Sequence, residues 1–127
     1  MAMYTRFAIR YDGWFRILAT AMGIGPGVSR VQVGPDGLRV RMGWAFQARI
    51  DRAAITGAAP YTGAIGGIGV HGLGGVYLVN GSTRGLVRID LTTTQRHQAR
   101  CTGIPVKLLT LIVSLEDPEG FQEALGF

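Results

Sequence analysis

Cysteine, histidine and acidic residues are scarce in this chain of 127 residues. Its one cysteine, Cys101, excludes an internal disulfide and favours a reducing compartment. No segment supplies the roughly 20 consecutive apolar residues that span a bilayer. Arg6 and Arg10 interrupt the start of the chain, where a signal peptide would be apolar. These absences predict a soluble cytoplasmic protein, with peripheral contact to a membrane as an alternative.

Arginine and glycine are in excess. Twelve of the 13 basic residues are arginine, and the net charge is +5. Guanidinium forks suit carboxylates and phosphates, so the charge indicates either an anionic partner or a solvated basic surface. Of 20 glycines, eight fall between Gly57 and Gly75. With 47% hydrophobic and 17% charged residues, the composition predicts one globular domain over residues 1–127.

Alternation of apolar and polar residues dominates the chain and predicts seven or eight antiparallel strands. The clearest hairpin joins residues 29–33 to 38–42 through Gly-Pro-Asp-Gly, and the strand 46–51 follows it. Residues 76–79 and 86–91 are predicted to form a second hairpin. We predict further strands over residues 4–11, 14–21 and 106–115, a glycine-rich loop over 57–75, and an irregular connection over 92–105.

The end of the chain has the signals of a short helix, predicted over residues 117–126. Asp117 suits the N-cap, Pro118 the first helical position, and Gly126 the stop. Phe121 and Leu125 lie on one apolar face. Because so short a helix is not stable alone in water, we expect it to pack on the strands.

The glycine-rich segment contains Gly67-Ile-Gly69-Val-His-Gly72, which matches the dinucleotide-binding pattern GxGxxG. A true fingerprint follows a strand and opens a helix. Here a strand is predicted next, so we interpret the segment as a loop that crosses the end of a barrel. An anion-binding nest of backbone N–H groups and a flap over a cavity are the alternatives.

Other candidate chemistry is sparse. His97 and Cys101 have the spacing of two metal ligands on one helical face, but two ligands do not make a site. Ser82, His71 and Asp90 include the residue types of a hydrolase triad, without the Gly-x-Ser-x-Gly turn. We therefore predict no metal site, no cofactor and no enzymatic activity. An enzyme that uses the glycine loop as an oxyanion nest is the least favoured class.

Arginines on the predicted hairpin form a stripe. Arg39 and Arg41 face one side of their strand, Arg49 lies nearby on the next, and Arg30 with Gln32 extends the same face. Such a stripe suits phosphate, an acidic protein partner or anionic lipid.

Trp44 lies at the tip between two predicted strands, beside Arg41. It could anchor the protein at a membrane interface, act as a hot spot for a partner, or plug the end of a barrel. Nucleic acid is not favoured, because its binding usually needs several basic residues interleaved with exposed aromatics, and Trp44 beside Arg41 is the one such pair. The predicted contact residues are Arg39, Arg41, Trp44 and Arg49.

Two segments resemble the bacterial pleckstrin-homology-like (PH-like) domains. Residues 36–43 (DGLRVRMG) with 46–51 (FQARID) look like the family's GL-x-V hairpin, and residues 113–125 (VSLEDPEGFQEAL) are similar to its closing strand and helix. The resemblance covers residues 14–125 and implies a mainly β, PH-like barrel capped by one C-terminal helix. Eukaryotic relatives often hold phosphoinositides with a basic first hairpin, whose lysine and arginine spacing is absent here.

This resemblance implies a recognition or scaffold module. We therefore expect a non-enzymatic binding module that contacts a protein partner or an anionic surface of phosphate or lipid headgroups. The alternative is a small β-barrel carrier of an apolar molecule, with the glycine-rich loop as its flap. A homo-oligomer stays open.

Overall fold

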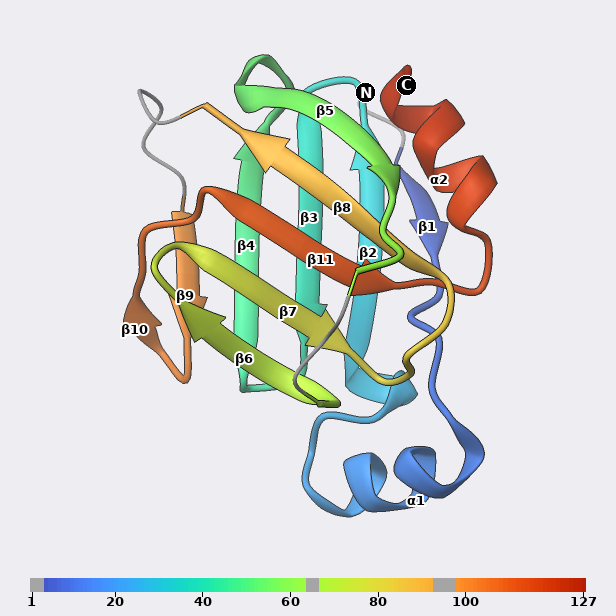
Figure 1. Ribbon diagram of the computed structural model, residues 1–127. Coiled ribbons are helices and arrows are strands. Elements are labelled where there is room, and N and C mark those ends of the chain that lie inside the picture. The colour runs from blue at the N-terminus through green and yellow to red at the C-terminus, as the bar shows by residue number, and fades with distance from the viewer. Residues whose placement is uncertain (1–3, 64–66, 93–97) are drawn as a thin grey trace.

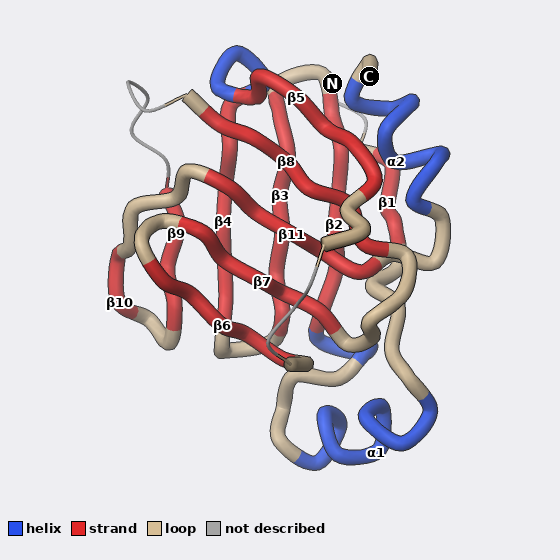
Figure 2. Tube along the Cα trace, in the orientation of Figure 1, coloured by secondary structure: helices blue, strands red, loops and turns tan. Residues whose placement is uncertain are grey.

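The computed structural model of the chain is mainly β and describes residues 4–63, 67–92 and 98–127. Its strands form two sheets that lie face to face, and the strands of one sheet cross those of the other (Figures 1 and 2). In spatial order, the first sheet contains β1 (Thr5–Phe7), β2 (Ser29–Gly34), β3 (Gly37–Met42), β4 (Phe46–Asp51), β9 (Gln98–Cys101) and β10 (Ile104–Pro105). The second contains β5 (Ile55–Pro60), β8 (Leu86–Leu91), β11 (Thr110–Ser114), β7 (Val76–Asn80) and β6 (Gly69–Leu73).

The predicted hairpin and the strand after it are confirmed as β2, β3 and β4, joined by antiparallel pairing. Their side chains alternate between the space between the sheets and the outer surface, as period-2 patterning requires. Val31, Val40 and Ala48 lie opposite one another on the inner face and are buried. The core between the sheets is completed by side chains of the second sheet such as Val87, Ile89 and Leu111.

The second hairpin prediction is wrong. β7 and β8 are strands, but β11 lies between them, parallel to β7 and antiparallel to β8. All five residues of β11 are buried, and so apolar a strand gains most from a central place with a neighbour on each side. The strand predicted over residues 106–115 is shorter in the structure, where it spans only β11.

The glycine-rich segment is not one long loop. β5 and β6 fall within or overlap residues 57–75 and form the two edges of the second sheet. The fingerprint glycines therefore precede and enter a β-hairpin of β6 and β7, not a helix. A Cβ at Gly72 would lie 2.1 Å from the Tyr77 ring, which explains the glycine there. Residues 64–66 lie outside the described chain.

Two other connections also differ from prediction. The segment 92–105 contains β9 and β10, so it is not wholly irregular, although residues 93–97 lie outside the described chain. In the segment 4–11, only β1 is a strand, and Ile9 and Tyr11 make isolated bridges. The described residues thus form eleven strands, where seven or eight were predicted.

Residues 14–21 were predicted as a strand and instead lie within the helix α1 (Gly13–Ala21). Phe15 and Ala19, one turn apart, are its buried residues, whereas Ile17 between them is 76% exposed. Alternation requires all three on one face, but helical spacing fits the burial that is found. The sequence of this segment fits the spacing of a strand and that of a helix about equally. The tertiary contacts of Phe15 and Ala19 therefore favour the helix.

The C-terminal helix is confirmed as α2 (Pro118–Leu125). The Asp117 carboxylate accepts from the Gly120 N–H at 3.0 Å, and Gly126 adopts the left-handed conformation at the stop. Phe121 is fully buried and packs edge-to-face on Phe7. A mainly β architecture with this closing helix is therefore confirmed, while the closed PH-like barrel stays a prediction.

Two short 3-10 turns, η1 (Pro26–Val28) and η2 (Arg52–Ala54), complete the described secondary structure. η2 follows directly after Asp51, the last residue of β4. In the part of the chain that the structure describes, no helix has the length and apolar character needed to cross a bilayer.

Candidate functional site: an arginine face

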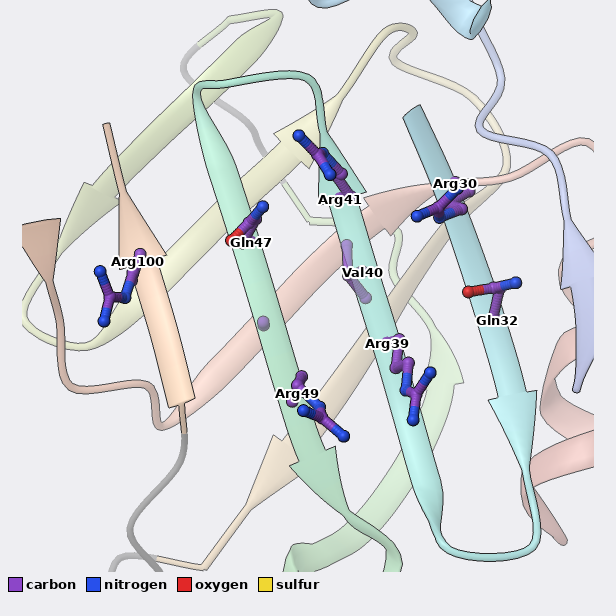
Figure 3. A pocket seen from close by; sticks show the side chains of 9 residues that line it. Arg30, Gln32, Arg39, Val40, Arg41, Gln47, Arg49 and Arg100 are labelled. Carbon is purple, nitrogen blue, oxygen red and sulfur yellow. The ribbon is translucent and has the colours of Figure 1, made fainter. Parts of the chain in front are cut away.

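Arginine side chains gather on the outer surface of the first sheet (Figure 3). On antiparallel strands, residues directly opposite one another project from the same face. One row across the sheet is therefore Arg30, Arg41, Gln47 and Arg100. The neighbouring row contains Gln32, Arg39 and Arg49. We call this surface the arginine face, defined by Arg30, Arg39, Arg41, Arg49 and Arg100.

The arginine face is hollowed. A pocket of about 230 Å³ is lined by its five arginines together with Gln32 and Gln47, and reaches Val40 and Ala48. A second hollow of about 250 Å³ lies next to it, where Arg30 and Arg41 meet Arg6 of β1 and Val28 of η1. The surface therefore offers a ligand guanidinium and amide donors around shallow depressions.

Four arginines of this face stand directly opposite one another in two pairs, and none of them makes an ion pair among the described residues. Arg30 lies opposite Arg41, and Arg39 lies opposite Arg49. Like charges in such positions destabilise a sheet. All eight acidic residues lie in the described part of the chain, and the ion pair found there is Arg88–Asp90, on the other sheet. Asp36 interacts electrostatically with Arg39 and Arg49, and both arginines lower the pKa of its carboxyl group, so the fold offsets the positive charge of this face only in part.

Tyr4 closes one edge of the arginine face. The Arg39 guanidinium lies 4.4 Å from the centre of the Tyr4 ring, a cation–π contact. The Tyr4 hydroxyl donates a hydrogen bond to the Asp36 carboxylate. That bond raises the pKa of Tyr4 and lowers the pKa of Asp36, so Asp36 stays ionised and is held by Tyr4. Sequence reasoning missed Tyr4, because no local pattern connects it to Arg39.

The structure brings together three of the four predicted contact residues. Arg39, Arg41 and Arg49 share the arginine face, with Arg30 beside them as the stripe predicted. Arg100 was missed, because β9 was read as an irregular connection. Its register opposite Gln47 places it on the same face.

Trp44 lies off the arginine face, at the turn between β3 and β4. It is 59% exposed, so the interpretation as a buried plug is wrong. Its indole N–H donates to the Met22 carbonyl oxygen at 2.7 Å, which joins this turn to the end of α1.

Apolar side chains are exposed around Trp44. We call this surface the apolar patch; its members come from α1, η1 and the β3–β4 turn, and are Trp14, Ile17, Leu18, Met22, Val28 and Trp44. A groove of about 410 Å³ opens within it, between α1, Trp44 and β6, and its walls are mostly apolar. Val28 lines a hollow together with Arg30 and Arg41, so the apolar patch adjoins the arginine face.

The other candidate residues are not assembled into a site. Ser82 Oγ donates to Asp12 at 2.7 Å, and Asp90 is held by Arg88, so no triad of Ser82, His71 and Asp90 exists. His71 Nε2 lies 3.1 Å from the Ile68 carbonyl oxygen. Among described residues, no three histidine, cysteine or acidic side chains group as metal ligands. His97 lies outside the described chain, so its pairing with Cys101 stays a hypothesis.

No family model matches the chain, and neither the curated proteins nor the solved structures give a match.

Proposed function

We propose that this protein is a non-enzymatic binding module whose arginine face holds closely spaced anionic groups of a partner, phosphates above all. The two directly opposed arginine pairs carry the proposal, because no described carboxylate forms an ion pair with them. Planar guanidinium groups bind phosphate oxygens through paired hydrogen bonds. An anion bound between two opposed arginines would attract both of them and so offset their mutual repulsion.

The lining of the face supports recognition as its role. Arginines and glutamines surround the hollow, so it offers a ligand positive charge and hydrogen-bond donors. The PH-like interpretation of residues 36–51 and 113–125 is part of this proposal, and it too favours a module that recognises a partner. The basic surface proposed here lies on β2, β3, β4 and β9, and α1 occupies residues 14–21, which were predicted as a strand.

A nuclear magnetic resonance titration with inorganic tripolyphosphate tests this function. We expect saturable shifts of the side-chain Nε–Hε signals of Arg30, Arg39, Arg41, Arg49 and Arg100. Arg52 and Arg84 lie outside the hollow and serve as internal controls. Shifts of equal size in all arginines, or shifts that do not saturate, would show that the probe senses only net charge and would contradict the proposal.

The carrier of an apolar molecule is the second candidate, favoured by the groove of about 410 Å³. Ile68, Gly69 and Val70, from the glycine-rich segment, form part of its wall. Native mass spectrometry of the protein purified from its own source would support the carrier if an apolar molecule accompanies the chain. Such a molecule should be displaced when Leu18, which lines the groove, is replaced by tryptophan.

A further inference from the structure

We infer that the apolar patch enters the interfacial layer of an anionic lipid bilayer while the adjoining arginines hold the headgroup phosphates. This inference rests on the proposed function, because it names a bilayer as the source of the phosphates. It adds a second contact, made by apolar side chains, to the electrostatic one.

The exposure of the apolar patch is the first support. Ile17 is 76% exposed and Trp14 is 62% exposed, both on α1, and Trp44 projects from the β3–β4 turn that is bonded to the end of this helix. Three separate chain segments bring their large apolar side chains to one end of the molecule. A contiguous apolar surface with a polar rim marks an interaction site on a protein.

The chemistry of the patch suits the interfacial layer of a bilayer. Both tryptophans of the chain lie in it, and tryptophan concentrates where headgroups meet acyl chains. The Trp44 N–H is already bonded to the Met22 carbonyl oxygen, so this ring can leave water without losing a hydrogen bond. On α1 the side away from the sandwich also carries apolar side chains, Trp14, Ile17 and Leu18, and helices with such an exposed apolar surface lie in this layer.

Charge is distributed to orient this end toward an anionic surface. Arg6, Arg30 and Arg41 adjoin Val28 of the patch. The acidic residues Glu116, Asp117, Glu119 and Glu123 lie on or just before α2, at the other end of the sandwich from α1 (Figure 1). Attraction of one end and repulsion of the other would present the apolar patch to the lipid.

A bilayer explains the patch better than a second copy of the chain. Each copy of the chain has a net charge of +5, and a dimer built on the patch would bring two positively charged molecules together. Such like-charge contacts disfavour association. An anionic bilayer covers the same apolar side chains and supplies negative charge at their border.

Tryptophan fluorescence of the full chain tests the inference, because both tryptophans report on the patch. The probes are vesicles of phosphatidylcholine, with or without phosphatidylglycerol, and vesicles whose acyl chains carry bromine. We expect a blue shift of the emission and quenching by the brominated chains, both only when phosphatidylglycerol is present. Raising the salt concentration should reverse both effects by screening the arginines.

A pair of variants separates insertion from adhesion. Ile17→Gln should weaken co-sedimentation with phosphatidylglycerol vesicles about tenfold, since one exposed apolar side chain no longer enters the lipid. Glutamine is a good helix former, so α1 should persist, which circular dichroism can check. Phe127→Gln is the matched control, because Phe127 is also exposed but lies beyond α2. It should leave binding unchanged.

The outcomes distinguish the two proposals. Vesicle binding without a blue shift or quenching would overturn the inference and leave the proposed function standing, as would binding of tripolyphosphate but not of vesicles. Binding of neither probe would mean that the proposed function itself fails. A blue shift that depends on protein concentration without vesicles would assign the patch to a second copy and overturn the inference.

Discussion

Replacing both Arg41 and Arg49 with glutamine is expected to weaken binding of tripolyphosphate about 30-fold, at roughly 1 kcal/mol for each exposed charge-assisted contact. The pair is chosen because it removes one arginine from each opposed couple. Arg39 keeps its contact with the Tyr4 ring, so the edge of the face stays in place. Isothermal titration calorimetry can measure the change.

The same variant should not be less stable than the native protein. Each substitution relieves a directly opposed like-charge pair, whereas the loss of Arg49 also removes its attraction to Asp36, so we expect the free energy of unfolding to be unchanged or to rise by at most about 0.5 kcal/mol. The Nε–H of Arg41 donates to the Gly43 carbonyl oxygen at 3.3 Å, a long bond whose loss is a small opposing effect. If these arginines serve binding and not folding, the variant should bind tripolyphosphate more weakly and be no less stable than the native protein.

Arg52→Gln combined with Arg84→Gln is the matched control. It removes the same charge from outside the hollow, so only the general electrostatic attraction should fall. If this control weakens binding as much as the variant of the arginine face, the ligand senses net charge alone. If the Arg41 and Arg49 variant unfolds more easily than the native protein, these arginines support the fold, and the interpretation of the face is wrong.

Gly43→Ala is expected to lower the free energy of unfolding by about 3 kcal/mol, combining backbone strain with steric overlap. Gly43 has a φ of +51°, and a Cβ there would lie 2.1 Å from the Gly23 carbonyl oxygen. Its N–H donates to the Val28 carbonyl oxygen at 3.1 Å. Because Gly43 has no Cβ, the β3–β4 turn can pack closely against the segment that follows α1.

Urea titration of Gly43→Ala beside Gly74→Ala isolates the steric contribution. Gly74 has a similar φ of +61°, but no atom lies within 4 Å of where its Cβ would be. We expect Gly74→Ala to cost only about 1 kcal/mol from strain. Equal losses in the two variants would show that the β3–β4 turn and the end of α1 are not tightly packed.

The arginine face could largely be predicted from sequence because its determinants are local. Gly34-Pro-Asp-Gly37 sets the turn, and alternation then places Arg39 and Arg41 outward. The strand β4 follows after a short turn, so Arg49 falls into register without information from distant residues. Where chain order and spatial order agree, pattern and turn chemistry suffice.

The remaining features depend on contacts between distant segments. β11 separates β7 from β8, and nothing between residues 76 and 91 indicates that a later strand will enter there. Arg100 joins the arginine face through pairing of β9 with β4. In α1, the burial of Phe15 and Ala19 against the sandwich decides for a helix over an equally patterned strand. The apolar patch follows from that helix, and so could not be predicted without it.

The central claim is that the arginine face binds anions, and that its opposed arginines are retained for this function although they repel one another. The most direct test is thermal unfolding of the native chain with increasing tripolyphosphate at constant ionic strength, beside the Arg41 and Arg49 variant. A ligand that binds only the folded state raises stability with its concentration. We predict that the midpoint of the native protein rises and that of the variant hardly changes. Equal rises in both proteins, or none in either, would contradict the claim.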